Sequence, residues 1–204
     1  MSPVAARADH ARPVSAHAFR AFQATRPDGE RWELIAGHPV MMAPPTLAHN
    51  RIAGNLERLL NDALARHDPG RLANQRPGIE IGQPDDLYWP EPDVAVIDAD
   101  FAPGQRFVDR AYLLAEIVSA SDRDVVPGGA EPWLTVKRRL YRAHPACTAI
   151  LVIEQDRIAV EVESRTGAGW SASGLGASDR LVLPAFGLDC PVVGLYAGTP
   201  AARG

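Results

Sequence analysis

The run from Tyr112 to Val118 is apolar apart from Glu116, and it constrains the fold more than any other stretch of the chain. A nearly continuous apolar run of this length is typical of a central strand whose two faces are both covered. An isolated carboxylate inside such a strand costs several kcal/mol to bury unless it is paired or bound to a metal. The run therefore predicts a covered sheet in which Glu116 has a partner.

Two other charged residues accompany apolar runs on either side of Glu116. Asp93 opens the run Pro92–Ile97, and Lys137 follows in the segment Val136–Tyr141. Lys137 is the only lysine in a chain with 20 arginines, so this position is set apart from the rest. A lysine ammonium is a compact point charge with a tunable pKa, unlike a guanidinium. Asp93, Glu116 and Lys137 together predict a hard-metal site that cleaves phosphodiester bonds.

Phosphodiester hydrolysis requires an activated water, stabilised phosphoryl charge and assistance to the leaving oxygen. Mg²⁺ or Mn²⁺ serves all three and prefers oxygen ligands, which predicts Asp93, Glu116 and the main-chain carbonyl of Ile117 as ligands. Lys137 would orient or deprotonate the attacking water, or neutralise developing charge. Flanking phosphates are assigned to a local basic patch of Arg138, Arg139 and Arg142.

The same three residues also permit a purely structural interpretation. Asp93 follows a proline and would serve as a turn residue at the entry of a strand. Lys137 and Glu116 would form a buried ion pair. Their loose spacing does not choose between the two interpretations.

Glu33 and His49 have similar alternatives. Glu33 lies between Trp32 and Leu34, so it points to the face opposite theirs, where a solvated strand residue is the ordinary expectation. His49 falls near the buried face of an expected helix, where a histidine is more often a satisfied polar residue than a ligand.

The length of 204 residues and the composition, with 46% hydrophobic and 23% charged residues, suit one folded domain. A net charge of −4 argues against an overall basic nucleic-acid binder but leaves room for a local basic face.

Cys147 and Cys190 lie in apolar contexts and are expected to be reduced, buried thiols. No apolar run approaches the ~20 residues that cross a bilayer, and no signal-peptide pattern is present, so we expect a cytoplasmic protein.

Local patterns predict the order of the elements. Helices are expected from Ser15 to about Ala24, from a Thr46 cap to about His67, and from Glu131-Pro132 onward. Strands are expected over 31–36 and 39–42 around a Gly37-His38 turn, over 148–153, and over 157–163 as an edge strand. A further strand is expected over 72–81, with a bend or bulge at Pro77-Gly78. Residues 164–180 read as one short strand between loops, and loop 119–130 is centred on Pro127–Gly129. The domain is expected over 15–197, with a flexible tail at 1–14 and a loose one at 198–204.

Five blocks in order resemble the Uma-type family of restriction endonucleases, across about Phe19 to Leu195. They are Glu33-Leu-Ile-Ala-Gly, the segment from Met42 through His49 to Leu56, Pro92-Asp93-Val-Ala-Val, Ala115-Glu116-Ile-Val-Ser-Ala-Ser, and Lys137-Arg-Arg-Leu-Tyr. The resemblance implies the PD-(D/E)xK nuclease superfamily, with a mixed α/β fold in which helices flank a central mixed sheet around a divalent-metal site.

What the resemblance implies for the site is specific. Asp93 and Glu116 match the metal-binding acids, and Lys137 matches a lysine that replaces the usual one two residues after the glutamate, where Val118 stands. Glu33 and His49 inherit a supporting role.

The chain departs from the family pattern at several positions. Ala36 and His38 stand where acidic residues are typical, Ser119-Ala-Ser121 replaces Ser-Pro-Ser, and the loop before Lys137 is longer. Three functions follow as expectations: a Mg²⁺- or Mn²⁺-dependent endonuclease acting on DNA, a catalytically silent module that binds nucleic acid or protein, and a homodimer formed through the strand at 157–163 or the apolar C-terminal segment.

Overall fold

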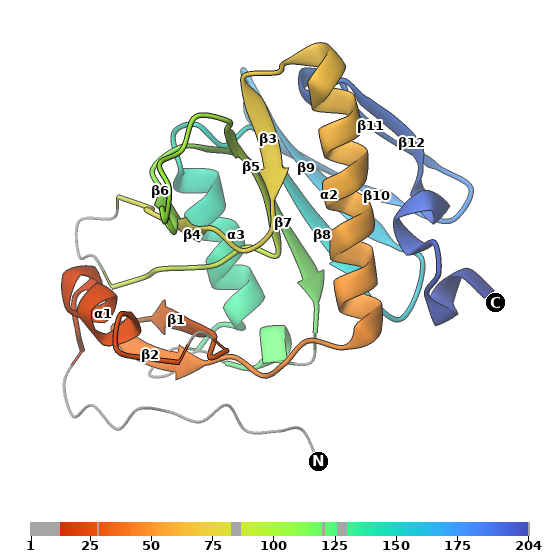
Figure 1. The fold of residues 1–204 in the computed structure, drawn as a ribbon. Coiled ribbons are helices and arrows are strands. Elements are labelled where there is room, and N and C mark those ends of the chain that lie inside the picture. The colour runs from red at the N-terminus through yellow and green to blue at the C-terminus, as the bar shows by residue number, and fades with distance from the viewer. Residues whose placement is uncertain (1–12, 28, 83–86, 120, 126–129, 204) are drawn as a thin grey trace.

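A mixed sheet of six strands forms the centre of the molecule in the computed structural model (Figure 1). Its strand order is β10-β9-β8-β7-β5-β3, in which β7 and β8 run parallel and the other neighbours run antiparallel. The strands are β3 (Arg71–Asn74), β5 (Val94–Asp98), β7 (Ala111–Val118), β8 (Ala149–Glu154), β9 (Val160–Thr166) and β10 (Gly169–Leu175). The structure describes residues 13–27, 29–82, 87–119, 121–125 and 130–203.

The strand predicted around Glu116 is β7, and its central position is confirmed because all eight of its residues are buried between β5 and β8. Alternate side chains pack on opposite faces, as the pleat requires. Helix α2 (Leu47–His67) covers one face and α3 (Trp133–Ala143) covers the other (Figure 1). The predicted mixed sheet flanked by helices is therefore confirmed.

Helix α3 carries the chain from β7 to its parallel neighbour β8, a connection that two adjacent parallel strands require. Its buried side chains include Val136, Leu140 and Tyr141. The loop before α3 is closed at its base by a bridge between Val125 and Pro132. The centre of that loop, at 127–129, lies outside the described residues.

Helix α2 begins as predicted, because the Thr46 hydroxyl accepts a hydrogen bond from the His49 N–H at 3.1 Å. Its apolar stripe packs on the sheet and on a C-terminal hairpin formed by β11 (Arg180–Leu183) and β12 (Leu188–Pro191). The sequence patterns missed β12. After the hairpin, Thr199 is buried and Pro200–Arg203 forms a 3₁₀ turn without a buried residue.

The N-terminal part packs around a small apolar core of its own. Helix α1 (Ala16–Gln23) lies on the hairpin of β1 (Trp32–Ile35) and β2 (His38–Met41). The turn is Ala36-Gly37 and not the expected Gly37-His38, since Ile35 still pairs with His38. Both turn residues have positive φ, 50° and 77°, as a type I′ hairpin requires. Of the expected tail 1–14, residues 1–12 lie outside the described part of the chain.

Two strand expectations are corrected. The segment at 157–163 is not an edge, because β9 pairs with β8 on one side and with β10 on the other. The Gly- and Ser-rich sequence of β10 has low strand propensity, yet it pairs with β9 over its full length, so tertiary pairing overrides propensity. The predicted strand 72–81 breaks at Pro77, which lacks an N–H, and resumes as β4 (Gly78–Ile79) beside β6 (Phe107–Val108).

Two smaller expectations concern burial. Cys147 and Cys190 are both unpaired and buried, as predicted. Within the described ranges, no helix has the length and apolar character needed to cross a membrane.

Candidate active site

Strand register brings Asp93 and Glu116 together at one end of the sheet. Strands β5 and β7 are antiparallel with Val94 opposite Ala115, and the Asp93 N–H donates to the Ala115 carbonyl at 2.9 Å. Asp93 therefore lies across from Glu116, and residues that face each other on antiparallel strands share a face of the sheet. Both carboxylates are buried on the side covered by α3.

Helix α3 supplies the partner that Glu116 was predicted to need. The Lys137 ammonium lies 2.9 Å from Glu116 Oε2 and 3.0 Å from a carboxylate oxygen of Glu33. One turn further along α3, the Tyr141 hydroxyl donates to Glu116 Oε1 at 2.5 Å. The longer loop thus does not keep Lys137 from the site, and the ion pair expected under the structural interpretation is present.

Glu33 is fully buried, so the expectation of a solvated strand residue is wrong. Its neighbours Trp32 and Leu34 fill the core under α1, and the alternation of β1 turns Glu33 toward α3. One oxygen of Glu33 accepts a hydrogen bond from the Trp133 indole N–H at 2.7 Å, and the other accepts one from the Glu91 main-chain N–H at 2.9 Å.

Asp93 is held by donors from three parts of the chain. His49 Nε2 lies 3.0 Å from Asp93 Oδ1 and an Arg31 nitrogen lies 3.5 Å from the same oxygen, while the Ile117 N–H donates to Oδ2 at 2.8 Å. Burial alone would raise the pKa of Asp93, but the His49 hydrogen bond and the charges of His49, Arg31 and Lys137 lower it to about 2. Asp93 is therefore a carboxylate throughout the physiological range.

Glu116 differs from Asp93 in its protonation. Burial raises the pKa of Glu116 to about 8 against the opposing charge of Lys137, and the negative charges of Asp93, Asp122 and Glu33 add to the rise. Burial lowers the pKa of Lys137, but Glu116 and Glu33 outweigh that effect and raise it above its usual value. Lys137 therefore stays protonated, whereas Glu116 binds a proton more readily than an ordinary glutamate because it is buried among other carboxylates.

A cavity of about 80 Å³ opens on these groups, between the β2–α2 connection and the sheet. Its charged lining contains the carboxylates Asp93, Glu116 and Asp122 and the cations Arg31 and Lys137. Such oxygen donors suit Mg²⁺ or Mn²⁺, and the raised pKa of Glu116 indicates uncompensated negative charge that a cation would relieve. In the described part of the chain, no three His, Cys, Asp or Glu side chains are prearranged around one metal position. The residues therefore fit a metal held by two carboxylates and completed by main-chain or water oxygens.

The predicted basic patch lies against carboxylates of its own. Arg138 pairs with Glu161 and Glu163, Arg142 pairs with Glu163, and Arg139 pairs with Glu131. None of these three arginines is among the residues that line the cavity at Asp93. Phosphate binding by Arg138, Arg139 and Arg142 stays a prediction.

Sequence patterns missed several residues that hold the site together. Arg31 has a signal in retrospect, because it is two residues before Glu33 and alternation places both on one face. Tyr141 is four residues after Lys137 on one face of α3. Asp122, which accepts hydrogen bonds from the Ser119 N–H and hydroxyl, has only the Ser-x-x-Asp spacing.

Comparisons with known proteins identify similar folds and the family of the chain. No curated protein matches the chain. A solved structure, described as a putative nuclease belonging to DUF820 from Anabaena variabilis, aligns over 91% of this chain and 98% of its own, with a TM-score of 0.67 and 15% identity. That likeness shows the fold alone. The sequence profile of the Uma2 family, described as "Putative restriction endonuclease", matches residues 17–192. The chain belongs to the Uma2 family, as the resemblance of its five blocks implied.

Proposed function

We propose that the protein is a divalent-metal-dependent endonuclease that hydrolyses phosphodiester bonds, with DNA as its substrate. The observation that carries this proposal is the convergence of Asp93, Glu116 and Lys137 on one small buried cavity. Membership of a family described as restriction endonucleases supports the reaction class. The hard oxygen donors support Mg²⁺ or Mn²⁺.

In this mechanism Asp93, Glu116 and the carbonyl of Ile117 would hold the metal. Once bound, the ion supplies Lewis-acid charge stabilisation and a more acidic water. The chain's own residues fix the two carboxylates: His49 and Arg31 hold Asp93, and Tyr141 holds Glu116. Each acid is therefore oriented before substrate arrives.

Lys137 acts as a cation and hydrogen-bond donor rather than as a base. Its pKa is raised by Glu116 and Glu33, so it does not give up its proton near neutral pH. Held by Glu116 and Glu33, the Lys137 ammonium orients the attacking water and neutralises charge that develops on the phosphoryl oxygens. Glu33 positions Lys137 through its own ion pair of 3.0 Å.

The test is a titration of Mn²⁺ and Mg²⁺ into wild-type protein and Asp93→Asn, following the melting temperature and the cleavage of labelled DNA. Asp93→Asn keeps the side-chain shape but removes a ligand charge, whereas Lys137→Ala would leave two buried carboxylates unpaired and confuse activity with stability. We expect a metal-dependent melting shift and cleavage in wild type and neither in the variant. Asp62→Asn, an exposed carboxylate on α2, is the matched control. Cleavage by Asp93→Asn at the wild-type rate would refute the assignment.

A second candidate is a module of the same fold that binds nucleic acid or protein without turnover. The observation that favours it is that donors already engage both oxygens of Asp93 and both oxygens of Glu116. This candidate predicts no metal-dependent melting shift in wild type. A shift that is lost in Asp93→Asn would count against it.

A further inference from the structure

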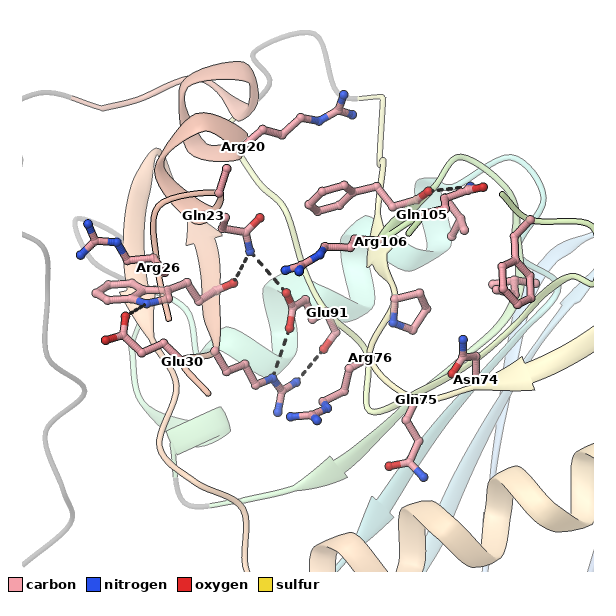
Figure 2. A pocket seen from close by; sticks show the side chains of 18 of the residues that line it. Arg20, Gln23, Arg26, Glu30, Asn74, Gln75, Arg76, Glu91, Gln105 and Arg106 are labelled. Atoms are coloured by element: carbon pink, nitrogen blue, oxygen red, sulfur yellow. Dashed lines mark hydrogen bonds and ion pairs between the residues drawn. The ribbon is translucent and has the colours of Figure 1, made fainter. Parts of the chain in front are cut away.

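A second and larger cavity, of about 650 Å³, adjoins the carboxylate site (Figure 2). Arg31 lines both cavities, and its guanidinium lies 3.5 Å from Asp93. In the larger cavity Arg31 also donates to the Glu91 carbonyl at 2.9 Å. The wall is built from four separate segments: the end of α1 with the residues after it, the β3–β4 connection, Glu91 ahead of β5, and the stretch from β5 to β6.

The lining of this cavity is basic in a protein whose net charge is −4. Its charged residues are Arg20, Arg26, Arg31, Arg76, Arg106, Glu30 and Glu91. Figure 2 shows Arg76 and Arg106 extending toward Glu91, across from the segment that carries Gln23. An excess of guanidinium groups in a concave site attracts phosphate, to which arginine can donate two parallel hydrogen bonds.

The backbone at Arg76 supports a functional role for that residue. Arg76 has φ of 54°, and among the described residues only Ala36 shares a positive φ without being glycine. Ala36 is explained by its hairpin turn, whereas Arg76 lies directly before Pro77 in the break between β3 and β4. A bulky residue held in this region is strained, and such outliers cluster at ligand sites.

Size and an exposed ring indicate which form of nucleic acid fits. The volume falls in the range of about 300–1,000 Å³ that encloses one small ligand, so the cavity admits part of a flexible strand but not a duplex. Phe101 lines it and is 47% exposed, although it is a large apolar side chain. Exposed aromatic rings in basic grooves stack the bases of single strands.

We infer that this cavity binds an unpaired strand of nucleic acid, with Arg76 and Arg106 on its phosphates and Phe101 against a base. The inference rests on the proposed nuclease function, and it specifies the substrate: an unpaired segment is held beside Arg31, next to the carboxylates that act on it. A duplex would have to open locally to occupy the cavity.

The test measures the anisotropy of a short labelled single strand and of the matched duplex, in EDTA so that no cleavage intervenes. Single strands of DNA and of RNA are both measured, and the one that binds more tightly identifies the preferred nucleic acid. We expect wild type to prefer the single strand. Arg76→Ala/Arg106→Ala should lower the slope of log affinity against log salt by roughly 1.4, the value for two phosphate contacts on a single strand. Phe101→Ala should weaken binding about tenfold, within the range for one base stack.

The matched control is Arg58→Ala/Arg180→Ala, which removes two exposed arginines outside the cavity. Equal or tighter duplex binding by wild type, or unchanged binding by Arg76→Ala/Arg106→Ala relative to this control, would overturn the inference. The Mn²⁺ melting shift separates the two hypotheses. If single strands bind but Mn²⁺ does not shift the melting temperature, the proposed nuclease function is refuted and strand binding in the cavity stands. If Mn²⁺ shifts the melting temperature but no strand binds, strand binding in the cavity is refuted and the proposed nuclease function stands.

Discussion

Lys137 donates a hydrogen bond of 2.9 Å to Glu116 across 21 residues of sequence, and both residues are 1% exposed. Because the same ammonium also contacts Glu33, it balances two buried carboxylates at once. Breaking a buried pair by removing one partner costs far more than the pair contributes as a whole.

Replacing Lys137 with methionine should therefore lower the free energy of unfolding by about 3–5 kcal/mol. Lys137→Met/Glu116→Gln should recover part of this loss, because the amide replaces one of the two buried carboxyl groups that lose the ammonium as a partner. Urea unfolding of the two single variants and the double variant, in the absence of metal, gives the coupling energy. Strictly additive losses would contradict the arrangement.

Asp93 should make the stability of the metal-free protein depend on pH. Its pKa is about 2 in the folded protein against 3.8 ordinarily, so the ionised form contributes stability that is fully present above the ordinary value and is lost as pH falls through about 2. The shift corresponds to about 2 kcal/mol. Urea unfolding of wild type and Asp93→Asn in EDTA, at about pH 6 and about pH 3, should show the difference between them shrinking in acid. A constant difference would show that His49 and Arg31 do not hold Asp93 in solution.

Trp133 should stabilise the site through its indole N–H and not only through its bulk. Trp133→Phe keeps most of the buried ring but removes the donor 2.7 Å from Glu33, which should cost about 1.5–3 kcal/mol as a lost hydrogen bond to a charged group. Trp170→Phe is the control, because that indole lies on the edge strand β10, stacks on Arg165 of β9, and should matter by less than about 1 kcal/mol. Thermal unfolding compares the two, and equal losses would remove the role assigned to the hydrogen bond.

The β1–β2 turn should accept a better residue. Ala36 has φ of 50° beside Gly37, and asparagine tolerates this conformation in type I′ turns better than alanine does. Ala36→Asn should raise the free energy of unfolding by roughly 0.5–1 kcal/mol. The control is Ala21→Asn on the exposed face of α1, which should lower the free energy of unfolding because asparagine is a poorer helix former than alanine. A loss of stability at position 36 would show that another contact fixes the turn.

The sequence predicts those parts of the site whose signal is local. Glu116 stands out because its strand is apolar on both faces, and the lysine at position 137 stands out among arginines. The helix caps at Ser15 and Thr46 are likewise local patterns and are confirmed. Each of these signals needs only a few neighbouring residues.

The larger misses depend on contacts between distant segments. Alternation says that Glu33 faces away from Trp32, but only the docking of β1 against α3 decides that this face is buried. The edge of the sheet was misplaced because β10 acquires strand structure by pairing with β9, which its Gly- and Ser-rich sequence does not signal. A homodimer through residues 157–163 loses its basis for the same reason, since that strand already has two neighbours.

The buried charges of Glu33, Glu116 and Lys137 come from three segments, and this has a consequence for folding. A partly folded form that docks the hairpin or β7 without α3 would bury a carboxylate with no ammonium beside it, at a cost of several kcal/mol. The cluster therefore couples the hairpin, the sheet and α3 into one all-or-none transition, so chains in which the candidate active site is only half assembled are rare.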